Sequence, residues 1–143
     1  MHASLKTRAA RDERPGDDAA ARPAAEIRSV AIIGAGQMGN GIAHVVSLGG
    51  YDVAINDIRK EAVDSAISTI RRNMARQVSR GLITDADMEQ ALKRITFADL
   101  DTIGQADLII EAATEDEQVK RKIFVDLVPK LKKNAMLASN TSS

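Results

Sequence analysis

A glycine-rich hexapeptide directly after an apolar run contains the residues of this chain whose types and spacing could do chemistry. The run is Val30-Ala31-Ile32-Ile33, and the hexapeptide is Gly34-Ala35-Gly36-Gln37-Met38-Gly39. Gly34 permits a tight turn, Gly36 lets a pyrophosphate approach the backbone, and Gly39 lets the following helix pack closely against the strand. A strand, a glycine turn and a helix in this order predict a site for a dinucleotide.

The charge pattern around the glycines narrows the kind of site. No Lys or Arg occurs from Ser29 to Ile58. Any phosphate bound there must be held by backbone N–H groups and the positive end of the helix dipole. A Walker-type phosphate loop needs a Lys after its last glycine, so the sequence argues against that class of nucleotide site.

Asp57 follows the next apolar segment and is the expected ligand of the adenosine ribose. A carboxylate there can accept hydrogen bonds from the ribose diol and would repel the additional phosphate of NADP, so NAD is the predicted cofactor. Arg59 leaves NADP open as an alternative, because its guanidinium could pair with a 2′-phosphate. A glycine turn with a purely structural role is the simpler alternative for the whole motif.

Two glutamates and one histidine are weaker candidates for a functional site. Glu111 and Glu115 follow an apolar strand at the edge where α/β sheets bind ligands. Acids at a helix start also complement the helix dipole, and spacing alone favours that explanation. His44 is expected to pack within the helix that follows the glycines. With two histidines and no cysteine, no metal site is expected.

The elements that must position these residues alternate between strand and helix. Apolar segments predict strands, and helical periodicity predicts helices that include Val119 on an inward stripe and Pro129 at a break. Gly49-Gly50 is expected to cap the first helix, and Thr84 with Asp87 to form a capping box. The expected strands are 27–33, 52–57, 94–97, 107–111 and 136–139, and the expected helices are 38–48, 59–79, 84–92 and 116–132. This alternation predicts an α/β fold, a Rossmann-type parallel sheet with crossover helices.

Length and composition bound the domain organisation and the partners. The chain has 143 residues, of which 44% are apolar, and is therefore one domain in size. Residues 1–26 lack periodicity and are predicted to be a disordered tail, and residues 27–143 the dinucleotide-binding domain. Equal numbers of basic and acidic residues, 20 each, and 2% aromatic residues argue against a nucleic acid as partner. No apolar run approaches the roughly 20 residues of a membrane helix. The absence of cysteine is compatible with a cytoplasmic location.

Three segments resemble the amino-terminal domain of the 3-hydroxyacyl-CoA dehydrogenases, including the bacterial 3-hydroxybutyryl-CoA dehydrogenases. They are the glycine segment through Ala43, residues 109–115 together with Lys120, and Ala138-Ser139-Asn140-Thr141-Ser142-Ser143. The Asn-Thr-Ser-Ser terminus at this distance from the glycines is the most specific of them. The resemblance covers residues 27–143 and implies an NAD-linked, reversible oxidation of the L-3-hydroxyl of an acyl-CoA to a 3-keto group.

The resemblance also implies roles for individual residues. Asp57 matches the ribose ligand of the family, and Glu115 and Lys120 match later contacts to the cofactor. Lys120 also lies near coenzyme A in the family, and Arg80 stands where the family can carry a Lys for coenzyme A. Ser142 matches the serine that touches both cofactor and substrate near the reacting carbon, and is therefore the expected catalytic residue.

Part of the machinery of the family does not occur in these 143 residues. Oxidation of an alcohol needs a base, and the family's base is a histidine, oriented by a glutamate, in a segment resembling His-Phe-Phe-Asn-Pro. We therefore expect a fold truncated before the later strands and the helical second domain, which binds NAD but turns over substrate poorly. At full length a homo-oligomer is expected. A stand-alone NAD-binding or regulatory module and another hydroxyacid dehydrogenase are the alternatives.

Overall fold

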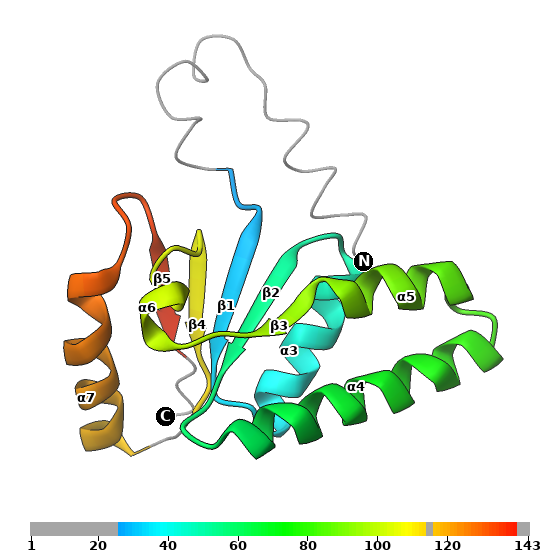
Figure 1. The fold of residues 1–143 in the computed structure, drawn as a ribbon, viewed down its shortest axis with the longest axis horizontal. Coiled ribbons are helices and arrows are strands. Elements are labelled where there is room, and N and C mark those ends of the chain that lie inside the picture. Colours follow the sequence, from blue (N-terminus) through cyan, green and yellow to red (C-terminus); the bar gives the residue numbers. More distant parts are fainter. Residues whose placement is uncertain (1–25, 114–115, 140–143) are drawn as a thin grey trace, which may run out of the picture.

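A parallel five-stranded sheet with helices on both faces is the core of the fold (Figure 1). The computed structural model describes residues 26–113 and 116–139. The strands are β1 Ser29–Ile33, β2 Asp52–Asn56, β3 Ile95–Phe97, β4 Leu108–Glu111 and β5 Met136–Ser139. Their order is β3-β2-β1-β4-β5, and each neighbouring pair runs parallel. The predicted Rossmann-type sheet is therefore confirmed.

Each connection between consecutive strands contains at least one helix, as is usual for crossovers between parallel strands. The helices are α3 Gln37–Leu48, α4 Lys60–Ser79, α5 Asp85–Lys93, α6 Leu100–Ile103 and α7 Glu117–Leu127, and the 3₁₀ turn η1 Val128–Lys130 follows α7. The sequence did not predict α6, because four residues are too few to show a helical period. Its start is set by Asp99, whose side chain accepts the N–H of Thr102.

Both faces of the sheet are buried, because alternate residues of a strand point to opposite sides. In β1, Val30 and Ile32 pack in a cluster with residues of α3, α4 and α5. Ala31 and Ile33 belong to a second cluster, which includes Ile103 of α6 and Leu127 of α7 in addition. This double burial explains why the central strands are continuous apolar runs rather than alternating ones.

The predicted helix ends are built as the sequence indicated. Gly50 has a φ of 100°, and the N–H groups of Gly50 and Tyr51 donate to the carbonyl oxygens of Ser47 and Val46. This is the Schellman arrangement, and its left-handed residue favours glycine. The capping box of α5 is also confirmed, because the side chains of Thr84 and Asp87 accept each other's backbone N–H at 3.0 Å.

The last helix is shorter than predicted, and its predicted inward stripe is wrong at its first position. The sequence placed a helix over 116–132 with Val119 inward, but α7 ends at Leu127, Pro129 lies in η1, and Val119 is 45% exposed. Lys120 is buried instead, with its ammonium group 3.9 Å from a carboxylate oxygen of Glu111. Hydrophobic periodicity cannot anticipate a charged residue at an inward position. The rest of the predicted stripe, Ile123, Leu127 and Leu131, lies in the second cluster as expected.

Three parts of the sequence lie outside the described residues, namely 1–25, 114–115 and 140–143. They include almost all of the predicted tail at 1–26 and the predicted contacts Glu115 and Ser142. Within 26–113 and 116–139, no helix combines the length and the apolar character that crossing a bilayer requires.

Candidate functional site

The glycine turn joins the carboxyl end of β1 to the start of α3, at the centre of the sheet. Gly34 has a φ of 111°, and a Cβ at this position would lie 2.6 Å from the Cα of Ala113. A Cβ at Gly39 would lie 2.0 Å from the carbonyl oxygen of Gly34. Any side chain at either position would therefore push two segments apart, and glycine permits the close approach.

Gly36 differs from the other two glycines because packing among the described residues does not require it. A Cβ built there meets no heavy atom within 4 Å, and its φ of −78° is open to any residue. Gln37 and Met38, which follow it, are exposed. No described residue accepts a hydrogen bond from the N–H groups of residues 36–39, and the first turn of α3 carries no acid. Open space beside Gly36, next to helix-start amides that bond to no described residue, suits an anion.

Asp57 follows β2 and faces the glycine turn. Its Oδ2 accepts the N–H of Ala35 at 2.9 Å, and its Oδ1 accepts the N–H of Arg59 at 3.0 Å. A carboxylate has about four acceptor sites, so these two bonds leave capacity for the hydroxyl groups of a ligand. Asp57 therefore supports the turn and also borders the adjoining pocket.

A pocket of about 650 Å³ extends from Asp57 across the carboxyl edge of the sheet to α7. Two apolar residues that line it are exposed, Ile58 at 98% and Val119 at 45%. Apolar side chains beside a polar group that fixes orientation are typical of a site for a planar base. Sequence reasoning missed both residues as lining. The position of Ile58, directly after the predicted ribose ligand, was the one available signal.

Glu111, the last residue of β4, is fully buried. Its Oε2 accepts the N–H of Ala113 at 2.8 Å, and its Oε1 accepts the hydroxyl of Ser139 at 2.9 Å and lies 3.9 Å from Nζ of Lys120. The alternative expectation, that acids at the helix start complement the dipole of α7, agrees with Asp116, which caps that helix. Glu111 lies before the helix and inside the protein.

Arg80 and His44 lie apart from the glycine turn. Arg80 is exposed at the carboxyl end of α4, while Asp57 lies just before the start of this 20-residue helix, which is about 30 Å long. Its predicted contact with coenzyme A stays a prediction. His44 is half-buried, with its Nε2 2.6 Å from Oε1 of Gln77, as expected of a packed helix residue.

The fold and the turn together define a class of protein. In a parallel sheet of this order, the strand order reverses between β1 and β4, and ligands bind at the carboxyl ends of the strands at that point. Gly34 and Ala113 meet there, and Asp57 lies on the β2 side. The protein is a dinucleotide-binding domain of the Rossmann type.

Comparison with known families narrows this class to a particular group. The family described as 3-hydroxyacyl-CoA dehydrogenase, NAD binding domain, matches residues 29–143, and the chain therefore belongs to this family. The cofactor of the domain is accordingly NAD.

Individual relatives agree with this assignment. The 3-hydroxybutyryl-CoA dehydrogenase of Bradyrhizobium diazoefficiens is 51% identical over 121 residues, which are 84% of this chain and 41% of that protein. The 3-hydroxyadipyl-CoA dehydrogenase of Escherichia coli is 40% identical over 118 residues, 82% of this chain and 25% of that protein. The crystal structure of (S)-3-hydroxybutyryl-CoA dehydrogenase from Ralstonia eutropha has a TM-score of 0.79 and 39% identity, and covers 82% of this chain and 42% of that one. The chain thus spans less than half the length of each of these relatives.

Proposed function

We propose that this chain is the NAD-binding portion of an oxidoreductase that reversibly oxidises an L-3-hydroxyacyl-CoA to the 3-ketoacyl-CoA. Bound NAD supplies the acceptor for the hydride. Relatives named 3-hydroxybutyryl-CoA dehydrogenase support the reaction class. The observation that carries the proposal is the open space at Gly36. The neighbouring amides donate to no described residue, and Asp57 supports the turn beside them.

The residues of the chain bind and orient the cofactor in this proposal. The amides of residues 36–39 hold the pyrophosphate, and the carboxylate of Asp57 holds the adenosine ribose. Ile58 and Val119 cover the adenine from the two sides of the pocket. Because the phosphates are met by amides alone, the site requires no cationic side chain from β1, α3 or β2.

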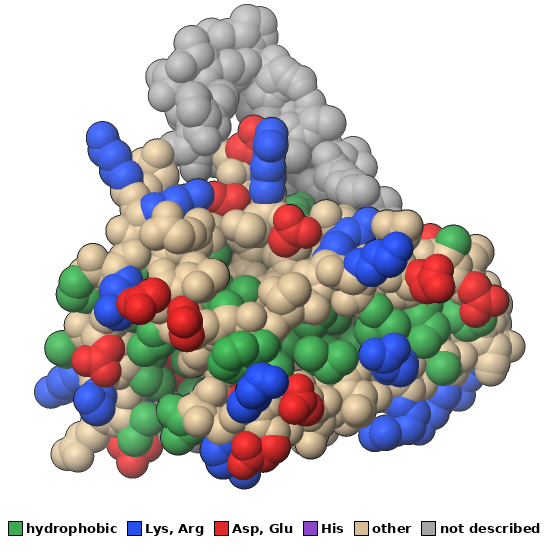
Figure 2. All heavy atoms as spheres, viewed as in Figure 1, with side chains coloured by type: hydrophobic (Ala, Val, Ile, Leu, Met, Phe, Trp, Pro, Cys, Tyr) green, Lys and Arg blue, Asp and Glu red, His purple; other side chains and the backbone are tan. Residues whose placement is uncertain are grey.

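The proposed substrate is a 3-hydroxyacyl thioester of coenzyme A. Arg80, Lys120 and Ser142 are its proposed contacts. Glu115, Lys120 and Ser142 are the proposed later contacts to the cofactor. Relatives of similar identity are named for 3-hydroxybutyryl-CoA and for 3-hydroxyadipyl-CoA, so we restrict the proposal to the class and leave the acyl group open. Figure 2 shows acidic and basic side chains interspersed on the face drawn, which does not favour a polyanion such as nucleic acid as the partner.

Two measurements test the cofactor site and the chemistry separately. Calorimetry of the 143-residue chain with NAD and with NADP is expected to give the tighter binding with NAD. The product of the complete reading frame, given NAD and L-3-hydroxybutyryl-CoA, is expected to form NADH, and the D-isomer serves as control. Absence of NAD binding would reject the proposed site. NAD binding without oxidation of any 3-hydroxyacyl-CoA would reject the substrate and leave the site standing.

A further inference from the structure

A buried carboxylate at the carboxyl end of β4 has no place among the predicted contacts to the cofactor. Glu111 is 0% exposed, on a strand that is otherwise apolar. Burying a charge costs free energy unless the charge is paired and hydrogen-bonded. An apolar residue would fill the same volume without that cost. A carboxylate at this position therefore indicates a role other than packing.

The carboxylate of Glu111 joins three separate segments. It accepts the N–H of Ala113 in the turn after β4 and the hydroxyl of Ser139 at the end of β5. It also forms an ion pair with Lys120 in the first turns of α7, a side chain that is 6% exposed. One side chain therefore connects the carboxyl ends of two neighbouring strands with the helix that links them.

Ala113, in the turn after β4 that Glu111 holds, packs directly against the glycine turn. The backbone of Ala113 packs so closely on Gly34 that a Cβ on the glycine would lie 2.6 Å from its Cα. The N–H of Ala112 donates to the carbonyl oxygen of Ile33 at 2.8 Å. Ala113 and Gly34 both line the pocket of about 650 Å³ that Asp57 borders. A shift of Ala113 would therefore change the shape of the cofactor pocket directly.

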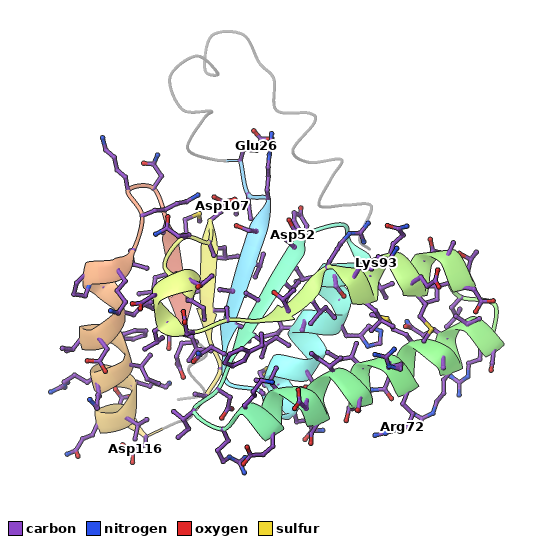
Figure 3. All side chains as sticks on the ribbon, viewed as in Figure 1. Glu26, Asp52, Arg72, Lys93, Asp107 and Asp116 are labelled. Atoms are coloured by element: carbon purple, nitrogen blue, oxygen red, sulfur yellow. The ribbon has the colours of Figure 1, made fainter. Side chains whose placement is uncertain are left out.

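Asp107, just before β4, is a matched carboxylate at the opposite edge of the sheet. It accepts the N–H groups of Arg28 and Ser29 at 2.8 and 3.1 Å and pairs with the ammonium group of Lys132. In Figure 3, Asp107 lies at the upper edge of the sheet, and Asp116, at the start of α7, lies near the lower, carboxyl edge. Both carboxylates tie β4 to its surroundings, but the glycine turn lies near Glu111 alone.

We propose that Glu111 is a positioning residue of the cofactor site, which acts through the backbone of Ala113. Its carboxylate holds Ala113 against Gly34 and ties this segment to Ser139 and Lys120. The backbone of Ala113 is then already in place when NAD binds. No free energy is spent on ordering this segment, and such preorganisation increases affinity. The inference rests on NAD binding at the glycine turn, as proposed above.

The test compares Glu111→Gln with Asp107→Asn in the 143-residue chain. Each substitution keeps the volume and removes the charge and one acceptor oxygen. For Glu111→Gln we expect about tenfold weaker NAD binding by calorimetry, and for Asp107→Asn a lower thermal midpoint with a dissociation constant within about twofold of the unmodified chain. Circular dichroism at the titration temperature verifies that each variant is folded.

Two further variants separate positioning from a general loss of structure. Glu111→Asp keeps the charge but withdraws the carboxylate by one methylene. We expect this variant to bind NAD about as weakly as Glu111→Gln does. Ser139→Ala removes one partner and leaves the charge in place, so it carries the test if Glu111→Gln does not fold. For Ser139→Ala we expect NAD binding about two- to fivefold weaker.

Unchanged NAD affinity in Glu111→Gln, or in Ser139→Ala where that variant carries the test, would overturn the inference. Equal losses of affinity in the Glu111 and Asp107 variants would overturn it too, because they would reflect stability alone. If the unmodified chain does not bind NAD, the cofactor site fails and the inference fails with it. Binding by the unmodified chain together with an unaffected Glu111 variant would reject only the positioning role.

Discussion

Gly36 and Asp57 contribute to the same turn in different ways. Nothing in the described protein comes within 4 Å of a Cβ placed at Gly36, so the fold itself does not require glycine there. Asp57, in contrast, accepts the N–H of Ala35 at 2.9 Å and thereby supports the turn whether or not a ligand is present. Substitution of Gly36 should therefore affect mainly the ligand, with a small cost at the N-cap of α3. Substitution of Asp57 should affect both ligand and turn.

Replacing Gly36 by valine tests the space in front of the amides. We expect Gly36→Val to stay folded with a slightly lower thermal midpoint, because a Cβ there meets no described atom but valine is a poorer N-cap residue than glycine. We expect NAD affinity to fall by about 100-fold or more, since the side chain fills the place of the pyrophosphate. Thermal unfolding and calorimetry on the same sample measure the two effects. Normal NAD binding by this variant would mean that the cofactor does not use the space.

Removing the carboxylate of Asp57 tests the ribose contact. We expect Asp57→Ala to weaken NAD binding about tenfold to hundredfold, because a hydrogen bond to a charged group contributes about 1.5–3 kcal/mol. Asp57→Asn is the control, since its amide oxygen can still accept the N–H of Ala35 and support the turn. The control should recover stability but not affinity, and it should discriminate less against NADP. An unchanged dissociation constant in Asp57→Ala would remove this residue from the site.

At the scale of elements, the approach of α3 to β1 decides where the helix start points. The carbonyl oxygen of Gly34 occupies the space that a Cβ of Gly39 would need. The same helix contains Gly41, where a Cβ would meet nothing within 4 Å. Packing among the described residues therefore requires glycine at position 39 but not at position 41 of the same helix.

These two glycines make a matched pair of substitutions. We expect Gly39→Ala to lower the free energy of unfolding by about 1–3 kcal/mol, because the helix must move away from the turn. We expect Gly41→Ala to be neutral or to raise that free energy by up to about 1 kcal/mol, because alanine is the better helix former. Urea denaturation of both variants makes the comparison. Similar stability of the two would contradict the close contact between α3 and the turn.

At the scale of the whole molecule, the two edges of the sheet have different functions. The carboxyl edge carries the glycine turn, Asp57 and the pocket. At the amino edge, Asp107 connects β4 to residues 28–29 and to Lys132 (Figure 3). Binding and fold stability are therefore separable by substitution at opposite ends of the same strands.

The amino edge predicts a dependence of stability on pH. Burial acts to raise the pKa of Asp107, but the hydrogen bonds from Lys132, Arg28 and Ser29 outweigh it and hold the pKa at about 2, below the ordinary 3.8. The unfolded chain therefore binds this proton more tightly. The contribution of Asp107 to stability, about 1–2 kcal/mol after solvent screening, is present above about pH 5 and is lost as the pH falls toward about 2.

Urea unfolding of the unmodified chain and of Asp107→Asn measures this contribution. We expect the two stability curves to differ most near neutral pH and to converge toward about pH 2, where the native carboxyl group is protonated as well. A constant difference across this range would contradict the role of the ionised carboxylate.

Much of the site could be predicted because it lies within one continuous segment. The strand, the turn, the start of α3 and the capping box of α5 depend on residues a few positions apart, and local backbone geometry decides them. The parts that could not be predicted depend on which segments meet. The periodicity of residues 116–132 placed Val119 inside, but it lies in the wall of the pocket and Lys120 is buried instead.

The amino-acid sequence by itself determined the class of fold, the glycine turn and the carboxylate after β2, because each is a matter of spacing along the chain. Only the tertiary structure decided that Glu111 points inward and that Ala113 forms a wall of the turn. The physical reason is that β4 and β1 are far apart in the sequence but are hydrogen-bonded neighbours in the sheet. Whether a carboxylate at the end of a strand faces solvent or a buried lysine follows from such pairings and from no local pattern.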